Sequence, residues 1–148
     1  MPTNVLDLTK PGTYPRSGRE LVGGVAYLGR AIDKMRADLN GTVGEYLAAC
    51  PQSRRVYALF GVTVEQFREA LQQQPVDQGV LRWLQEHGTA QPSQEQIKQF
   101  SEEILTSRVP PERLTRTLAS IGHPERTDIT TSVDLQDLEE ERDIPMRS

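Results

Sequence analysis

The residues best suited to chemistry lie on one face of the first long helix that the sequence predicts. From about residue 21 to residue 39, apolar side chains recur at alternating steps of four and three residues: Leu21, Val25, Leu28, Ile32, Met35 and Leu39. Arg30, Asp33 and Lys34 lie almost opposite this stripe, and the small residues Gly23 and Ala26 on the same face would let a ligand come close. Because guanidinium groups bind carboxylates and phosphates through paired hydrogen bonds, this face predicts a site for an anionic or polar ligand.

Seven residues form this candidate anion site: Arg16, Arg19, Arg30, Asp33, Lys34, Glu45 and Tyr46. In this interpretation the cationic side chains bind the anion and Asp33 orients an arginine. Two alternatives involve the same charges without a ligand. The charges could form exposed ion pairs that contribute little to stability, or a buried ion network that holds the N-terminal segment.

The remaining reactive residues give weaker indications. Glu45 follows a glycine-flanked stretch that has neither the Walker spacing nor a dinucleotide-binding pattern, and it is a conceivable acid or base only if buried. Cys50 has only His87 and His123 as possible bases, and their positions near predicted helix ends explain both histidines. One cysteine and two isolated histidines give no zinc pattern, and the acidic residues near the C-terminus are typical of a solvated helix face. We therefore predict no catalytic residue, no metal site and no cofactor.

Composition places the chain among soluble proteins. It has 148 residues, 17 basic and 21 acidic side chains, and 36% hydrophobic residues, which is compatible with one ordinary folded domain. No apolar run reaches the length of a membrane span, and the N-terminus lacks the pattern of a secretory signal. The single cysteine fits a reducing compartment, so we expect a cytoplasmic location.

Charge is unevenly distributed along the chain. Residues 1–60 carry 8 basic and 5 acidic side chains, whereas residues 123–148 carry 3 and 8. This asymmetry predicts that the acidic C-terminal segment packs on the basic N-terminal part, with Leu135 and Leu138 supplying apolar contacts. We do not expect nucleic acid as a partner, because the chain is net acidic and basic residues do not alternate with aromatic ones.

Apolar spacing is helical almost throughout, which predicts an all-α fold of about six short-to-medium helices in a single compact domain. We divide the chain into an extended N-terminal segment (1–18), a helical body (19–122) and an acidic C-terminal extension (123–148) packed on that body. Thr63 and Ser93 each begin a capping box, Ser53 and Asp77 are expected caps, and Pro110 precedes another helix. The segment 123–133 is rich in β-branched residues but has no evident partner strand.

An ordered set of motifs spans nearly the whole chain. It includes Asp7–Lys10, Pro15–Glu20, Arg30–Ala37, Gly44–Tyr46, Val80–Leu84 and Arg126–Thr131. This set resembles a family of small bacterial proteins classified as domain of unknown function number 5069, which implies no activity, ligand or pathway. The family pattern has proline where this chain has Gly29, and it has tryptophan near Phe100 and at Ser132. The chain thus lacks two large aromatic side chains that could line a site in the family.

The leading hypothesis for function is a non-enzymatic interaction or ligand-binding module whose arginine-rich first helix engages an anionic group. That group could belong to a protein partner, to a metabolite or to the chain's own C-terminal segment. The alternative is a small enzyme with a pocket around Arg30, Asp33, Lys34, Glu45 and Tyr46. An enzyme should bury Glu45 beside Asp33, whereas a binding module should present an open basic surface. Both a monomer and a homodimer are compatible with the sequence.

Overall fold

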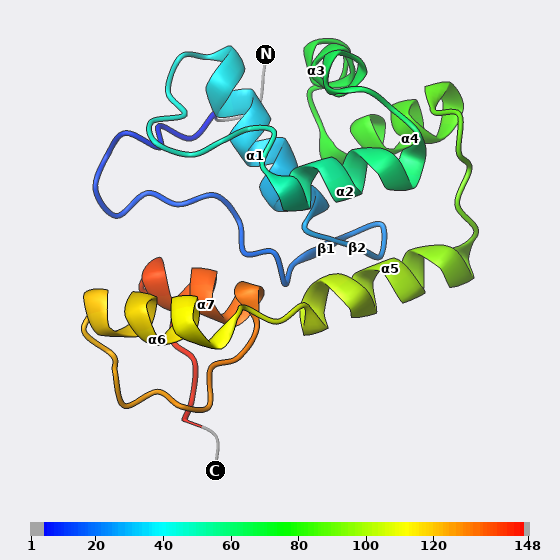
Figure 1. Ribbon diagram of the computed structural model, residues 1–148. Helices are drawn as coiled ribbons and strands as arrows, with labels where there is room; N and C mark the ends of the chain where they lie inside the picture. Colours follow the sequence, from blue (N-terminus) through cyan, green and yellow to red (C-terminus); the bar gives the residue numbers. More distant parts are fainter. Residues whose placement is uncertain (1–4, 147–148) are drawn as a thin grey trace.

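The fold is all-α, with one small hairpin. The computed structural model describes residues 5–146, and their elements follow one another as drawn in Figure 1. The hairpin strands are β1 (Leu21–Val22) and β2 (Val25–Ala26). The helices are α1 (Leu28–Leu39), α2 (Pro51–Phe60), α3 (Val64–Gln73), α4 (Asp77–His87), α5 (Gln94–Thr106), α6 (Pro111–Ser120) and α7 (Ser132–Glu139). None of these helices is long and apolar enough to cross a membrane.

The prediction of one continuous helix from residue 21 was wrong, because its first part is the β1–β2 hairpin. Leu21 pairs with Ala26 and Val22 with Val25, so the chain reverses at Gly23 and Gly24. Both glycines have positive φ angles, 58° and 83°, which only glycine adopts readily in such a tight turn. The helix begins only at Leu28. Gly23 therefore serves the turn and does not open a helix face to a ligand.

The helix boundaries confirm some predicted caps and correct others. The boxes that begin at Thr63 and Ser93 are both present. At α2, however, the sulfur of Cys50 caps the helix in place of Ser53, accepting a hydrogen bond from the Ser53 N–H at 3.5 Å. At α4 the cap residue is Val76, and Asp77 makes no side-chain cap, because its carboxylate pairs with an arginine from another part of the chain.

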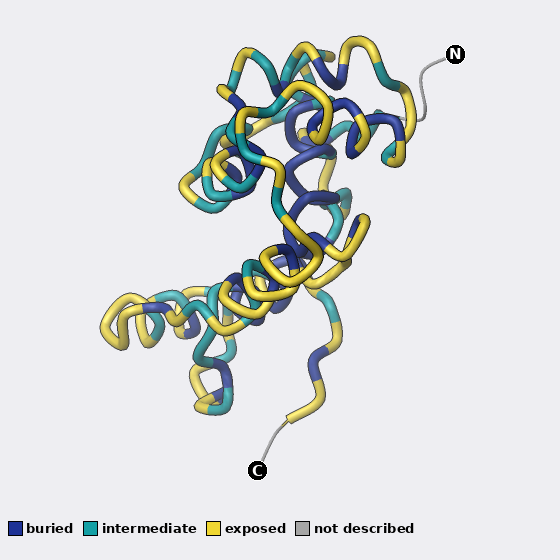
Figure 2. Tube along the Cα trace, turned by 90° about the vertical axis from the view of Figure 1, so that its right-hand side faces the viewer, coloured by how far each residue is buried: buried dark blue, intermediate teal, exposed yellow. Residues whose placement is uncertain are grey.

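Two apolar clusters support these elements. The larger one includes Leu28, Ile32 and Met35 of α1, which are completely buried, and α1 packs on α2, α3 and β1. The smaller one joins α6, α7 and the segment after α7, and includes Ile129, Leu138 and Ile144. In Figure 1, α6 and α7 lie side by side, and α5 runs from them towards α4. Figure 2 shows α1 as a largely buried trace inside the body.

The C-terminal segment packs on the helical body, as the charge asymmetry predicted. Val133 belongs to the larger core cluster, and Leu135 and Leu138 are buried in the smaller one. The segment before α7 also has a partner that sequence reasoning did not identify. An antiparallel bridge joins Arg108 to Thr131, and the Ser132 N–H donates to the backbone of residue 107 at 3.0 Å. This packing brings the carboxylates of α7 against the N-terminal segment and α1.

Candidate functional site

Arg16 and Arg19 of the predicted anion site are both paired with carboxylates of this chain. The Arg16 guanidinium donates to Asp33 Oδ2 at 3.0 Å and to Asp77 Oδ2 at 2.6 Å. The backbone N–H of Arg16 also donates to Asp33 Oδ2, at 2.8 Å. Arg19 pairs with two carboxylates of α7: Asp134 and Asp137. These contacts fasten the N-terminal segment to α1, α4 and α7 through ion pairs whose arginines are partly or largely exposed.

Arg30 makes the most buried of these ion pairs. Its Nη1 and Nη2 donate to Glu140 Oε1 and Oε2 at 2.8 and 2.6 Å, and the two residues are only 3% and 6% exposed. The Tyr46 hydroxyl donates to Glu140 Oε2 at 2.8 Å, and Arg142 donates to Oε1. Burial alone would raise the pKa of Glu140, but the hydrogen bonds and charge of Arg30 outweigh it, so this pKa lies below its ordinary value.

Two tyrosine rings flank the Arg30 guanidinium. Its Cζ lies 5.9 Å from the Tyr27 ring centroid and 5.7 Å from the Tyr46 ring centroid, within the range of cation–π attraction. Burial is the main cause that raises the pKa of each tyrosine. Both phenols therefore stay protonated at neutral pH, and they position the guanidinium without adding charge.

Arg30 and Tyr46 also line a surface pocket of about 430 Å³. Its lining residues come from the N-terminal segment, α1, the loop after α1, α6 and the end of α7: Tyr14, Arg30, Glu45, Tyr46, Arg113, Gln136, Glu139 and Glu140. Two of these lining residues have a side-chain atom that is buried without a hydrogen-bond partner: Arg30 Nε and Gln136 Oε1. One is a donor and the other is an acceptor, and buried polar groups of this kind are uncommon in folded proteins.

Lys34 and Cys50 form a second polar cluster, with Tyr27. Lys34 is only 3% exposed, and its Nζ donates to Cys50 Sγ at 3.0 Å and to Tyr27 Oη at 3.3 Å. The Tyr27 hydroxyl is itself 3.3 Å from Cys50 Sγ. Burial alone would raise the pKa of Cys50, but hydrogen bonds from Lys34, Ser53 and Tyr27 lower it to about 6. These hydrogen bonds therefore favour the thiolate form of the sulfur.

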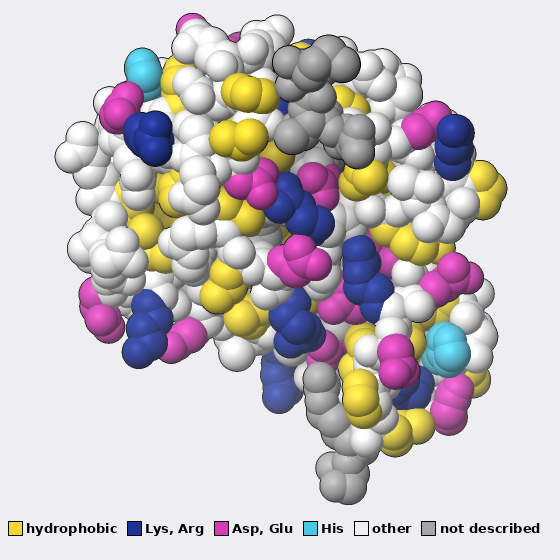
Figure 3. Space-filling model, turned by 180° about the vertical axis from the view of Figure 1, so that it is seen from behind, with side chains coloured by type: hydrophobic (Ala, Val, Ile, Leu, Met, Phe, Trp, Pro, Cys, Tyr) yellow, Lys and Arg dark blue, Asp and Glu magenta, His cyan; other side chains and the backbone are white. Residues whose placement is uncertain are grey.

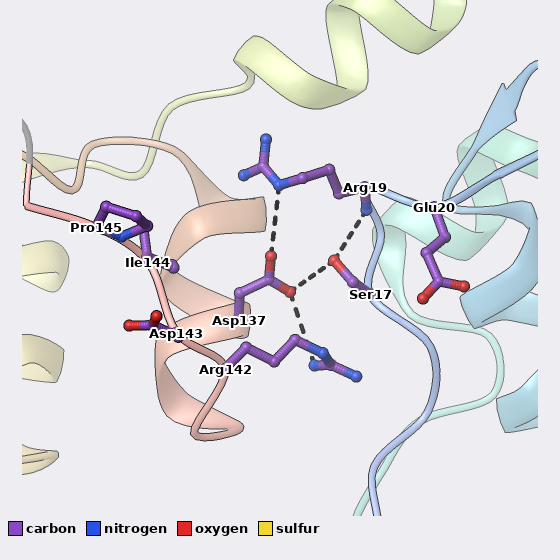
Figure 4. Close-up of a pocket in the computed structure, with 8 residues that line it drawn as sticks. All are labelled: Ser17, Arg19, Glu20, Asp137, Arg142, Asp143, Ile144 and Pro145. Atoms are coloured by element: carbon purple, nitrogen blue, oxygen red, sulfur yellow. Dashed lines mark hydrogen bonds and ion pairs between the residues drawn. The ribbon is translucent and has the colours of Figure 1, made fainter.

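A further pocket, of about 480 Å³, lies between the N-terminal segment and the end of α7 (Figure 4). Asp137 lies at its centre and accepts a hydrogen bond from the Ser17 hydroxyl at 2.7 Å. Arg19 Nε and Arg142 Nη1 lie 3.6 and 3.7 Å from its carboxylate oxygens. The cations around this hollow are thus already engaged by a carboxylate of the chain itself.

The seven predicted site residues do not converge on a single surface. Arg30, Glu45 and Tyr46 share the 430 Å³ pocket, whereas Arg16 and Asp33 belong to the network with Asp77. Lys34 contacts Cys50, and Arg19 lies beside α7.

Glu45 is exposed, so it does not form the buried pair with Asp33 that the enzyme alternative expects. Nor is there an open basic surface on the face drawn in Figure 3, where basic and acidic side chains intermingle.

Sequence reasoning missed several residues of these two clusters. Glu140 and Gln136 lie more than 100 residues from Arg30 along the chain, and no local pattern connects them. The sequence suggests only His87 and His123 as bases for Cys50, whereas the structure places Lys34 beside it. The Cys50–Pro51 pair itself was an available signal, because proline is frequent in the first turn of a helix and the residue before it often caps that turn.

Within residues 5–146, no group of three His, Cys, Asp or Glu side chains could hold a metal ion.

Comparison with known proteins identifies the family of this chain but gives no activity for it. A search of curated proteins finds no significant match to this chain. The profile of the domain of unknown function DUF5069 matches residues 12–142, which include α1, Cys50, Glu140 and every lining residue of the 430 Å³ pocket. Since this match covers most of the 148 residues, the chain belongs to the DUF5069 family.

Proposed function

We propose that this protein is a non-enzymatic module that binds a small polar ligand in the 430 Å³ pocket beside Arg30. The observation that carries the proposal is that two residues lining this pocket, Arg30 and Gln136, each hold a buried side-chain atom without a hydrogen-bond partner, Nε and Oε1. An unpaired donor and an unpaired acceptor each cost free energy until a partner satisfies them. A hydroxyl or amide group can accept a hydrogen bond from the donor and donate one to the acceptor.

The charges around the pocket narrow the class of ligand. The Arg30 guanidinium is already neutralised by Glu140, so this side of the pocket does not require a strongly anionic ligand. Three further charged side chains line the pocket and are exposed, one cationic and two anionic: Arg113, Glu45 and Glu139. A small zwitterion such as a free α-amino acid complements this mixture, with its carboxylate towards Arg113 and its ammonium group towards the glutamates. The predicted anionic ligand is thereby narrowed to a zwitterion, because the chain's own carboxylates already pair with Arg16 and Arg19.

The place of action is part of the same proposal. A single, partly exposed cysteine is compatible with a reducing compartment, and the family resemblance is to bacterial proteins. We therefore place the protein in the bacterial cytoplasm, where free amino acids and their hydroxylated analogues are available as ligands.

The test is a thermal-shift screen of the full chain with individual α-amino acids and small polyols. A ligand present at ten times its Kd should stabilise the protein by about 1.4 kcal/mol, which corresponds to a rise in Tm of roughly 3–6 °C for a chain of this size. Calorimetric titration would then measure the affinity of each compound that raises the Tm.

Matched variants assign any binding to this pocket. Arg113→Gln should lose most of the shift, because it removes the cation at the pocket. Arg116→Gln changes an exposed arginine on the same helix that does not line the pocket, so it should keep the shift. The proposal fails if no compound of either class raises the Tm, or if both variants respond like the unchanged protein.

A further inference from the structure

Lys34 is an amine buried beside a sulfur nucleophile. The residue is 3% exposed, and the hydrogen-bond partners of its Nζ are Cys50 Sγ at 3.0 Å and Tyr27 Oη at 3.3 Å, neither of them a carboxylate. A buried cation requires a nearby negative charge, since removal from water strongly disfavours an isolated ion. In its thiolate form Cys50 supplies that charge, with its sulfur 3.0 Å from the Lys34 Nζ.

The surrounding backbone holds this pair in place. Cys50 caps α2, where its sulfur accepts the Ser53 N–H at the positive end of the helix dipole. On the other side, Tyr27 has a φ angle of 70°, a left-handed conformation that is rare for an aromatic residue. The Tyr27 N–H donates to the carbonyl of Gly18 at 2.9 Å, and this contact helps to keep the strained residue beside the sulfur.

We propose that Cys50 and Lys34 are a peroxide-reactive pair that closes a covalent sulfur–nitrogen bond when the thiolate is oxidised. The first step needs only hydrogen peroxide from outside. The thiolate attacks one peroxide oxygen, the O–O bond breaks, and the Lys34 ammonium protonates the departing hydroxide. The products are the Cys50 sulfenic acid, one water molecule and a neutral Lys34 amine, so atoms and charge balance.

The second step follows from the loss of charge in the first. The sulfenic acid is neutral, so it no longer supports a buried ammonium group, and burial already lowers the pKa of Lys34. The amine therefore remains a nucleophile within reach of the sulfur. It attacks the sulfenic sulfur, the S–O bond breaks, and a second water molecule leaves. This step needs no further oxidant, and the flexible stem of lysine allows the approach.

The two residues differ in exposure in the way that this reaction requires. Cys50 is partly exposed, whereas Lys34 is buried, so the proposal requires the peroxide to approach from the cysteine side. The sequestered amine competes with free thiols in solution for the sulfenic acid, and a closed S–N bond protects the sulfur from further oxidation. This site is separate from the amino-acid pocket, and its failure would leave the proposed binding function untouched.

The experiment treats the reduced, full-length protein with hydrogen peroxide at neutral pH and measures its intact mass. Formation of the S–N bond removes two hydrogen atoms, so the mass should fall by about 2 Da. After tryptic digestion, the peptide of residues 31–36, uncut at Lys34, should be joined to the peptide of residues 37–54. A dithiol reductant should restore the starting mass.

Two comparisons make the result decisive. In urea the pair is separated, so the unfolded chain should gain oxygen on Cys50 without the link. Lys34→Arg keeps a cation but lacks the attacking amine, and should give a dimedone-reactive sulfenic acid with no link. If this variant does not fold, the comparison of folded and unfolded chains still decides the question. The proposal is overturned if the folded protein gains oxygen without a link, if the linked product retains an oxygen atom, or if the same link forms in urea.

Discussion

The buried Arg30–Glu140 pair allows a quantitative test of how the C-terminal segment is held. The two Glu140 oxygens accept two hydrogen bonds each: Oε1 from Arg30 and Arg142, and Oε2 from Arg30 and Tyr46. In Glu140→Gln one oxygen becomes an NH₂ donor, so two of the four acceptor contacts are lost and Arg30 keeps its charge without a counter-ion. Hydrogen bonds to charged groups contribute about 1.5–3 kcal/mol each. The loss should therefore lie near the ~3–5 kcal/mol typical of breaking one side of a buried ion pair.

Urea unfolding measures this change directly. Trp83 is the single tryptophan and is 4% exposed, so its fluorescence reports the unfolding of the body. Glu139→Gln is the matched control, because Glu139 is the neighbouring residue and is exposed, and exposed substitutions of this kind usually change stability by less than about 0.5 kcal/mol. A Glu140→Gln protein within about 1 kcal/mol of the unchanged protein, with the same denaturant slope, would refute the argument that this pair anchors the segment.

The same pair predicts a dependence on pH. Because the folded protein lowers the pKa of Glu140, the stabilisation is complete above the unfolded value of about 4.3 and is lost as the pH falls through the lower, folded value. The difference in stability between the unchanged protein and Glu140→Gln should therefore shrink in acid. A difference that stays constant from neutral pH to about pH 3 would contradict this assignment.

Two further changes test the core and the C-terminal segment. Ile32→Ala should lower the free energy of unfolding by about 2–5 kcal/mol, because Ile32 is completely buried, and urea unfolding at unchanged slope would measure it. Near-normal stability of that variant would contradict the burial of the α1 stripe. Deletion of residues 124–148 should lower the Tm and strengthen heparin binding, since it removes the carboxylates that neutralise Arg19 and Arg30. Unchanged melting and unchanged amide-exchange protection would mean that the segment contributes nothing to the body.

Local signals in the sequence determined most of the helices. The capping boxes at Thr63 and Ser93 depend on hydrogen bonds between residues three positions apart, so a short window of sequence contains the whole interaction. The apolar stripe of α1 from Leu28 onwards was evident for the same reason. Periodicity failed at residues 21–27, because the hairpin strands contribute apolar residues at spacings that also suit a helix, and the turn depends on the positive φ angles of Gly23 and Gly24.

The candidate sites depended on contacts between distant parts of the chain. The sequence by itself determined that the first helix carries cations and that the C-terminal segment carries carboxylates, and their attraction was predictable from charge alone. Only the tertiary structure decided that Arg30 pairs with Glu140 and that Lys34 contacts Cys50. The physical reason is burial: once packing removes an ion from water, its partner is whichever opposite charge the fold brings within hydrogen-bond distance, and sequence separation has no part in that choice.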